Sequence, residues 1–252
     1  MTHALPASFS PPADLLAGRR ILITGAGEGL GKAAAMACAQ HGATVILLGR
    51  TVKKLEHTYD AIERAGGVQP AIYPMNLAGA AWKDHVDLAD TLEREFGTLE
   101  GLLHCAVHFK SFSPMLQIEP KDWIENLQTN LTAAYALTRE LMPLMRAATD
   151  ASVVFTADRP SHGARAYDGV YGVAKAAVEQ MMQIWAAEQD EHSTVRLNSF
   201  NPGPIRSGVR LRGFPGERAE SIALPEQVMP QLLWLLSNQS RGLNGQSTVM
   251  PE

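Results

Sequence analysis

The sequence is poor in cysteine, and it has no long apolar run. Cys38 and Cys105 are its two cysteines in 252 residues. One pair cannot build a disulfide framework, so we expect reduced thiols and a cytoplasmic location. No apolar run reaches the roughly 18 to 20 residues that span a bilayer, and the first residues lack the basic region and apolar stretch of a secretory signal. We therefore expect no membrane partner.

Charge of one sign is not in excess either. Lys and Arg number 22 against 26 Asp and Glu, which gives a formal net charge of −4. No basic excess points to a nucleic-acid partner, and no acidic run points to a disordered tail. Apolar residues make up 46% of the chain and charged residues 19%, so the chain has ample material for a buried core.

Short apolar runs alternate with helix-favouring segments almost from end to end. The proline-containing residues 1–17 are expected to form a flexible arm. The patterns predict strands at 20–24, 44–48, 68–73, 99–106, 151–156, 194–200 and 246–250, and helices at 29–41, 51–65, 80–96, 120–146 (bent near Pro143), 169–188 and 225–236. Continuous apolar strands between helices are typical of a mostly parallel sheet covered on both faces. Residues 18–252 are therefore predicted to form one doubly wound α/β domain with about seven strands.

A glycine-rich turn links the first expected strand to the first expected helix. It reads Thr24-Gly25-Ala26-Gly27-Glu28-Gly29-Leu30-Gly31. Glycines let the backbone turn sharply and approach a pyrophosphate, and the helix N-terminus supplies free N–H groups and a positive dipole end. In this strand–turn–helix context, the turn predicts a dinucleotide site.

The second expected strand ends at Gly49-Arg50, where an NAD site commonly has an acidic residue for the ribose 2′-hydroxyl. Arginine instead suits a 2′-phosphate, and Lys53 and Lys54 follow. Glu28 argues mildly against this reading, because its charge could repel the phosphate. On balance, the sequence favours NADP(H) over NAD(H).

Tyr171 and Lys175 lie four residues apart in Tyr171-Gly172-Val173-Ala174-Lys175. On a helix they share a face. A nearby cation favours the phenolate form of a tyrosine, so Tyr171 is suited to exchange a proton with an alcohol or a carbonyl.

These motifs together resemble the short-chain dehydrogenase/reductase family. The glycine turn, the Tyr171–Lys175 pair and Asn201-Pro202-Gly203 follow that family's order and spacing, from about Leu15 to Met250. The resemblance implies hydride transfer between a nicotinamide and the carbonyl or alcohol of a small molecule. Tyr171 would be the acid/base, and Lys175 would bind the nicotinamide ribose and tune Tyr171.

Further site residues follow from the same resemblance. Asn130 matches a helical asparagine that holds a proton-relay water, and Ser207 matches a hydroxyl that bonds the carboxamide. Other positions implied to line the cofactor site are Asn76, Leu77, Cys105, Ala106, Pro202, Gly203 and Ile205. A substrate lid is implied at about 206–224, and the helices at 120–146 and 169–188 would pair subunits in a homodimer or homotetramer.

The family's usual serine, thirteen residues before the tyrosine, is here Asp158. An ionised carboxylate only accepts hydrogen bonds, and it would oppose a developing oxyanion. Four roles remain open: a hydrogen-bond donor when protonated, a repulsive carboxylate, a partner for a cationic or polyhydroxylated substrate, or a partner of Arg159 or Arg165 in a site that no longer catalyses.

A second departure is His104-Cys105-Ala106-Val107, where the family has Asn-Asn-Ala-Gly. Val107 places a branched side chain where glycine lets the cofactor approach. His104 and His108 would not share a helical face on a strand and its loop, so no metal site is expected. We therefore expect an NAD(P)-dependent oxidoreductase. The alternative is a non-catalytic nucleotide-binding or regulatory protein on the same scaffold.

The expected lid is rich in arginine. Arg206, Arg210 and Arg212 lie within seven residues, and Arg218 follows. They are compatible with an anionic substrate, but the sequence favours a solvated loop that carries a few charges.

Overall fold

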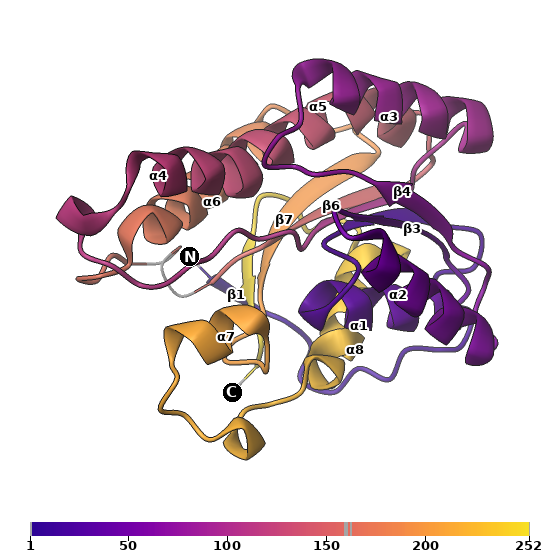
Figure 1. Ribbon diagram of the computed structural model, residues 1–252. Helices are drawn as coiled ribbons and strands as arrows, with labels where there is room; N and C mark the ends of the chain where they lie inside the picture. Colours follow the sequence, from indigo (N-terminus) through magenta and orange to yellow (C-terminus); the bar gives the residue numbers. More distant parts are fainter. Residues whose placement is uncertain (1, 159–160, 162, 252) are drawn as a thin grey trace.

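An eight-stranded parallel sheet forms the centre of the computed structural model, which describes residues 2–158, 161 and 163–251 (Figure 1). The strand order is β1-β8-β7-β6-β5-β2-β3-β4. The strands are β1 Thr2–Ala4, β2 Arg20–Thr24, β3 Thr44–Gly49, β4 Ala71–Pro74, β5 Gly101–His104, β6 Ala151–Thr156, β7 Val195–Asn201 and β8 Ser247–Val249. The predicted doubly wound fold is therefore confirmed, with one strand more than expected.

Helices cover both faces of this sheet (Figure 1). One layer holds α3 Trp82–Phe96, α4 Pro120–Leu127, α5 Ala133–Arg146 and α6 Gly169–Ala187. The other layer holds α1 Gly29–Gln40, α2 Val52–Arg64 and α8 Met229–Leu236, which follows a 3-10 turn at Pro225–Val228. A short helix, α7 Gly208–Gly213, lies apart from both layers, next to the carboxyl ends of the strands. No helix within the described residues is both long and apolar enough to cross a bilayer.

Each central strand contributes side chains to two hydrophobic cores, one on each face of the sheet. Leu22 packs in the core beneath α3, α5 and α6, whereas its neighbours Ile21 and Ile23 pack in the core beneath α1, α2 and α8. Successive side chains of a strand point to opposite faces, so a strand buried on both faces must be apolar at every position. This requirement explains the continuous apolar runs in the sequence.

Residues 2–17 differ from the flexible arm that we expected. β1 pairs in parallel with β8, and Leu5 and Leu16 are buried in the core beneath α1 and α8. The backbone groups at the edge of β8 and the two apolar side chains together hold a segment that its prolines alone predicted to be loose.

The long helix expected at 120–146 is interrupted, and the interruption is not at Pro143. A π-helical turn at Gln128–Thr132 separates α4 from α5, and Pro143 lies within α5. The widened turn contains Asn130, whose buried side chain is bonded to the loop after β5. Such single π turns are common at functional sites.

Candidate active site

A cavity of about 960 Å³ lies at the carboxyl ends of β2, β3, β5, β6 and β7. In open parallel sheets, this edge is where ligands bind. The predicted cofactor residues that line it are Gly25, Gly27, Glu28, Gly29, Leu30, Gly31, Arg50, Asn76, Leu77, Cys105, Ala106, Tyr171, Lys175, Pro202, Gly203, Ile205 and Ser207. Asp158 lines it too, so residues from seven separate chain segments meet in one cavity.

Thr24 does not line the cavity, because its side chain is buried behind it. Its Oγ1 accepts hydrogen bonds from the backbone N–H groups of Cys105 and Ala106, each at 3.0 Å. Thr24 therefore ties the end of β2 to the segment after β5, and it supports the cavity wall from behind.

Two glycines of the turn have no room for a side chain. A Cβ on Gly31 would lie 2.3 Å from the backbone oxygen of Gly25, and a Cβ on Gly25 would lie 2.9 Å from Cα of Ala106. Gly25 also has a φ of 69°, which side chains disfavour. The turn therefore brings bare backbone and the start of α1 to the cavity, as a pyrophosphate cradle requires.

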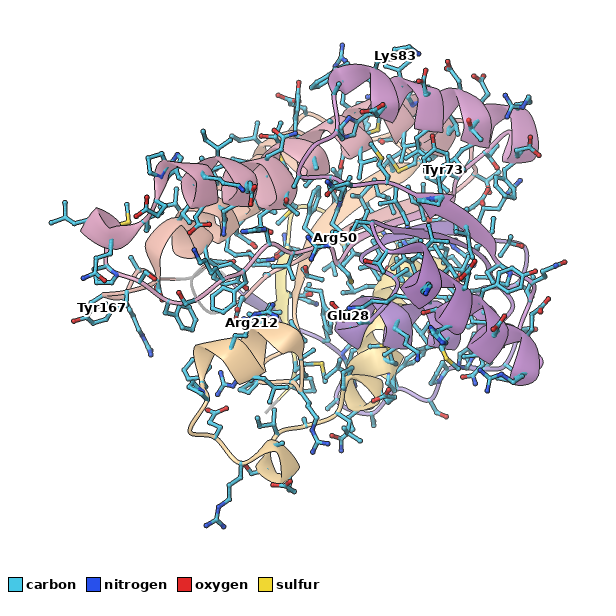
Figure 2. All side chains as sticks on the ribbon, viewed as in Figure 1. Glu28, Arg50, Tyr73, Lys83, Tyr167 and Arg212 are labelled. Carbon is cyan, nitrogen blue, oxygen red and sulfur yellow. The ribbon has the colours of Figure 1, made fainter. Side chains whose placement is uncertain are left out.

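Arg50 follows β3 directly and is exposed on the wall of the cavity, which Glu28 also lines (Figure 2). Glu28 forms an ion pair with Lys54 of α2. The carboxylate that argued against a 2′-phosphate is thus paired with a cation. Lys53 does not contribute to the lining of this cavity.

Tyr171 and Lys175 lie on α6 and are both buried. The Tyr171 hydroxyl donates a hydrogen bond of 2.7 Å to Oδ2 of Asp158. Lys175 Nζ donates to the backbone oxygen of Thr156 at 2.7 Å and lies 5.8 Å from the centre of the Tyr171 ring. Burial lowers the pKa of Lys175, and the charge of Asp158 opposes that shift. The cation therefore sits beside the phenol, as the spacing predicted.

Ser161 is bonded to Asp158 through the backbone: its N–H donates to the Asp158 backbone oxygen at 2.9 Å, and its Oγ accepts from the Asp158 N–H at 3.3 Å. Ser161 donates its hydroxyl to the backbone oxygen of Lys175 at 3.4 Å. The backbone N–H of Arg165 donates to Asp168, and its side chain lines the cavity. Arg159 lies outside the described residues. In this structure the Asp158 carboxylate accepts a hydrogen bond from the Tyr171 hydroxyl.

The residues in place of the family's two asparagines have separate roles. Thr138 donates its hydroxyl to the backbone oxygen of Ala134 at 2.8 Å, so Nε2 of His104, 2.9 Å away, must be the donor to Thr138. Burial, and to a lesser degree Lys175, lowers the pKa of His104 to about 3. Burial raises the pKa of the Cys105 thiol to about 12, so this thiol stays protonated and is unsuited as a nucleophile.

The side chain of Asn130 is hydrogen-bonded to the backbone of the loop after β5. Its Oδ1 accepts from the backbone N–H of His108 at 2.8 Å, and its Nδ2 donates to the His108 backbone oxygen at 2.8 Å and to Asn126 at 2.8 Å. A small cavity of about 10 Å³ lies behind it, lined also by Lys175 and Thr156. That is about the space of one water molecule.

Three phenylalanines next to Tyr171 were not predicted. Phe109 and Phe112 contact the Tyr171 ring edge-on, with centroids 5.0 and 6.3 Å away, and Phe214 contacts Phe112 at 5.5 Å. All three line the cavity. The pair Phe109 and Phe112 follows β5 at the ligand-binding edge, and that position was the signal available in the sequence.

The lid expected at 206–224 contains α7 and a 3-10 turn at Ala219–Ser221. The hydroxyl of Ser207 caps α7 by accepting from the backbone N–H of Arg210 at 3.2 Å. Arg210 pairs with Glu217 and stacks on Phe214. Arg212 lines the cavity (Figure 2), while Arg206 binds the backbone oxygen of Ala219. Two of the arginines, Arg206 and Arg210, thus interact with other groups of the same segment.

Comparison with known proteins identifies the class to which this fold and site belong. The family model of short chain dehydrogenases matches residues 19–215, and the chain belongs to that family.

Among individual proteins, the chain is 36% identical over 237 residues to the uncharacterized oxidoreductase YciK of Escherichia coli K12, covering 94% of this chain and 93% of that protein. A structure described as a short chain dehydrogenase from Pseudomonas syringae is 42% identical, has a TM-score of 0.93 and covers 96% of this chain and 98% of its own. Another, from Escherichia coli CFT073 and complexed with NADPH, is 36% identical, has a TM-score of 0.92 and covers 95% and 99%. These relatives support nucleotide-dependent oxidoreduction as the general activity.

Proposed function

We propose that this protein is an NADP(H)-dependent oxidoreductase that transfers a hydride between the nicotinamide and the carbonyl or alcohol of a small molecule. The observation that carries the proposal is the pairing of Tyr171 with Lys175 in the same cavity as the glycine turn. A proton donor and a cation beside it are needed where a carbonyl is reduced.

The chain's own residues fit the dinucleotide. Gly25 and Gly31, which have no room for a side chain, let the turn fold tightly and present its backbone to a pyrophosphate, and the N-terminus of α1 supplies N–H groups. Arg50 is suited to the 2′-phosphate, and Lys54 offsets the charge of Glu28. The NADPH complex of a relative 36% identical supports the same preference. When bound, this cofactor supplies or accepts the hydride.

Tyr171 would move the proton. In a reduction, its O–H turns from Asp158 to the substrate oxygen, and the Lys175 ammonium stabilises the phenolate left behind. The small cavity behind Asn130 and Lys175 has room for one water that could return the proton. Phe109, Phe112 and Phe214 would hold the apolar part of a substrate against Tyr171.

Asp158 supports a second candidate function. Tyr171 must leave a hydrogen bond to a carboxylate before it can protonate a substrate, and such charge-assisted bonds are stronger than neutral ones. A protein that binds nucleotide without turnover, as a regulatory member of the family, would retain this pair unbroken.

The substitution Tyr171→Phe separates the two candidates. A panel of aldehydes, ketones and quinones is screened for NADPH oxidation, and the best substrate is assayed with both proteins. We expect turnover in the wild type, loss of turnover in the variant and little change in NADPH affinity. NADPH binding with no turnover on any substrate, in wild type and variant alike, would favour the regulatory candidate.

We also propose a homodimer or homotetramer. The outer faces of the predicted pairing helices carry exposed apolar side chains, among them Ile124 of α4, Tyr135 of α5 and Ile184 of α6. Exposed apolar patches of this kind commonly mark interfaces. A monomer mass by light scattering would contradict this proposal.

A further inference from the structure

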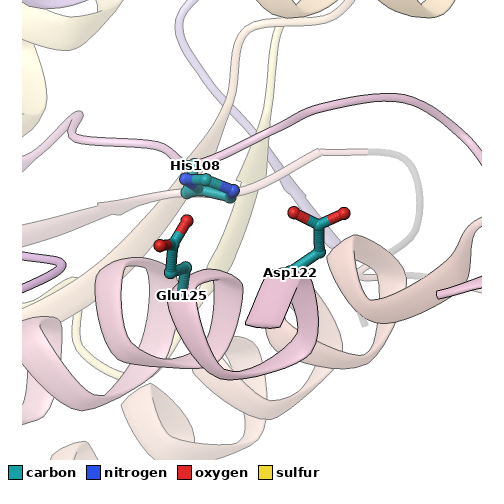
Figure 3. Close-up of side chains that lie close together, drawn as sticks. All are labelled: His108, Asp122 and Glu125. Atoms are coloured by element: carbon teal, nitrogen blue, oxygen red, sulfur yellow. The ribbon is translucent and has the colours of Figure 1, made fainter. Parts of the chain in front are cut away.

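A histidine and two carboxylates meet where the loop after β5 passes over α4. Figure 3 shows the imidazole of His108 facing Asp122 and Glu125. One ligand atom from each residue lies within 4.8 Å of the other two. The sequence predicted no metal site, because it considered His108 with His104 rather than with a helix that begins twelve residues later.

The fold places these three groups before any ligand is bound. Asp122 and Glu125 are three residues apart on α4, so they share one face of the helix. One turn further on, Asn126 and Asn130 hold the His108 backbone with hydrogen bonds of 2.8 to 3.0 Å. The backbone of His108 is therefore fixed beside the helix that carries the carboxylates.

The imidazole also has an unused ligand atom. Nε2 of His108 is buried and has no hydrogen-bond partner among the described residues. A buried polar atom without a partner costs free energy, whereas a neutral imidazole nitrogen is a common metal ligand. The two carboxylates are paired with Lys110 and Lys121, whose side chains are largely exposed and can move away.

We propose that His108, Asp122 and Glu125 bind one divalent transition-metal cation at the rim of the active-site cavity. One nitrogen and two carboxylate oxygens suit Zn²⁺ or Mn²⁺. An ion with bonds of about 2.1 Å holds its ligand atoms roughly 3 to 4 Å apart, so modest side-chain rotations complete the site. His108 and Asp122 also line the large cavity, so the remaining coordination positions are available to water or to a ligand there.

The test is isothermal titration of the full chain, free of any histidine tag, with Zn²⁺ and separately with Mn²⁺. We expect saturable binding of one ion per chain by at least one of them. Asp122→Asn and Glu125→Gln should each weaken that binding at least about tenfold. Lys110→Ala should tighten it, because the lysine competes for Asp122.

The chain offers a matched control on α3. Lys83 pairs there with Asp87, which lies three residues after Asp84. Among the described residues, these two carboxylates do not form a cluster of possible metal ligands with a histidine. Asp87→Asn and Lys83→Ala should leave the binding unchanged. If they alter it as much as the α4 variants do, the ion binds surface carboxylates in general and the proposal fails.

A second measurement does not depend on the variants folding. Co²⁺ added to the unmodified protein should give a visible absorption band that Zn²⁺ removes, and it should quench Trp123, which lies between the two carboxylates in the sequence. Absence of saturable binding by Zn²⁺ and Mn²⁺, or of a Co²⁺ band, would overturn the proposal.

Discussion

Arg50→Ala tests the cofactor preference at a single residue. Arg50 is exposed on the cavity wall directly after β3. A hydrogen bond to a charged group contributes about 1.5 to 3 kcal/mol. Because water screens an exposed guanidinium, the lower part of that range applies, which corresponds to a loss of about 10- to 30-fold in NADPH affinity. NADH has no 2′-phosphate, so its affinity should stay the same.

The assay is titration by nucleotide fluorescence at low and at high salt. Lys53→Ala is the matched control. It removes a single positive charge three residues after Arg50, and the Lys53 side chain does not line the cavity. The difference between the two variants should shrink at high salt, where screening is stronger. Equal losses for NADPH and NADH, or equal losses in the two variants, would refute the assignment of Arg50.

Three further substitutions test other parts of the structure. Asp158→Ser should raise the rate of carbonyl reduction at least about tenfold, because it removes a charge that opposes the developing oxyanion; an unchanged rate on the best substrate would contradict this. Asp150→Asn should lower the free energy of unfolding by about 3 to 5 kcal/mol, measured with urea, since it breaks buried ion pairs to Arg19 and Arg196 and a more exposed one to Arg241 without touching the cavity. His104 is neutral when folded, with a pKa lowered to about 3, so the unfolded chain binds an extra proton below about pH 6.5 and stability falls by about 1.4 kcal/mol per pH unit on acidification. His104→Asn should remove that slope between pH 6 and 4.5, and a persistent slope would show that other groups cause it.

The sheet was predictable from the sequence because its strands are buried on both faces. Ile21, Leu22 and Ile23 serve two different cores, and this requirement leaves a continuous apolar run that no surface strand shows. β1 was not predictable in the same way. Its residues Thr2–Ala4 lack such a run, and they form a strand because β8 offers a free edge.

The π-helical turn at Gln128–Thr132 is a second feature that the sequence alone did not predict. Proline is the local signal for a bend, and Pro143 was therefore expected to cause one. The actual interruption accompanies the bonds of Asn130 to the backbone of His108, twenty-two residues away. Such a distant pairing leaves no periodic trace in the sequence.

The motif residues of the site were predictable as a group because parallel strands bring their carboxyl ends to one edge. What the sequence could not give was the geometry between segments. The bond between Tyr171 and Asp158 depends on where the residue two positions after β6 lies relative to α6. The contact of Phe214 with Phe112 depends on the position of α7, about one hundred residues away.

The central claim, that the cavity holds NADP(H), is tested most directly by titrating the purified wild-type protein with NADPH and with NADH under the same conditions. The account predicts saturable binding of one nucleotide per chain, with NADPH bound more tightly than NADH. Tighter binding of NADH would contradict the role given to Arg50. Failure of both nucleotides to bind would contradict the assignment of the cavity itself.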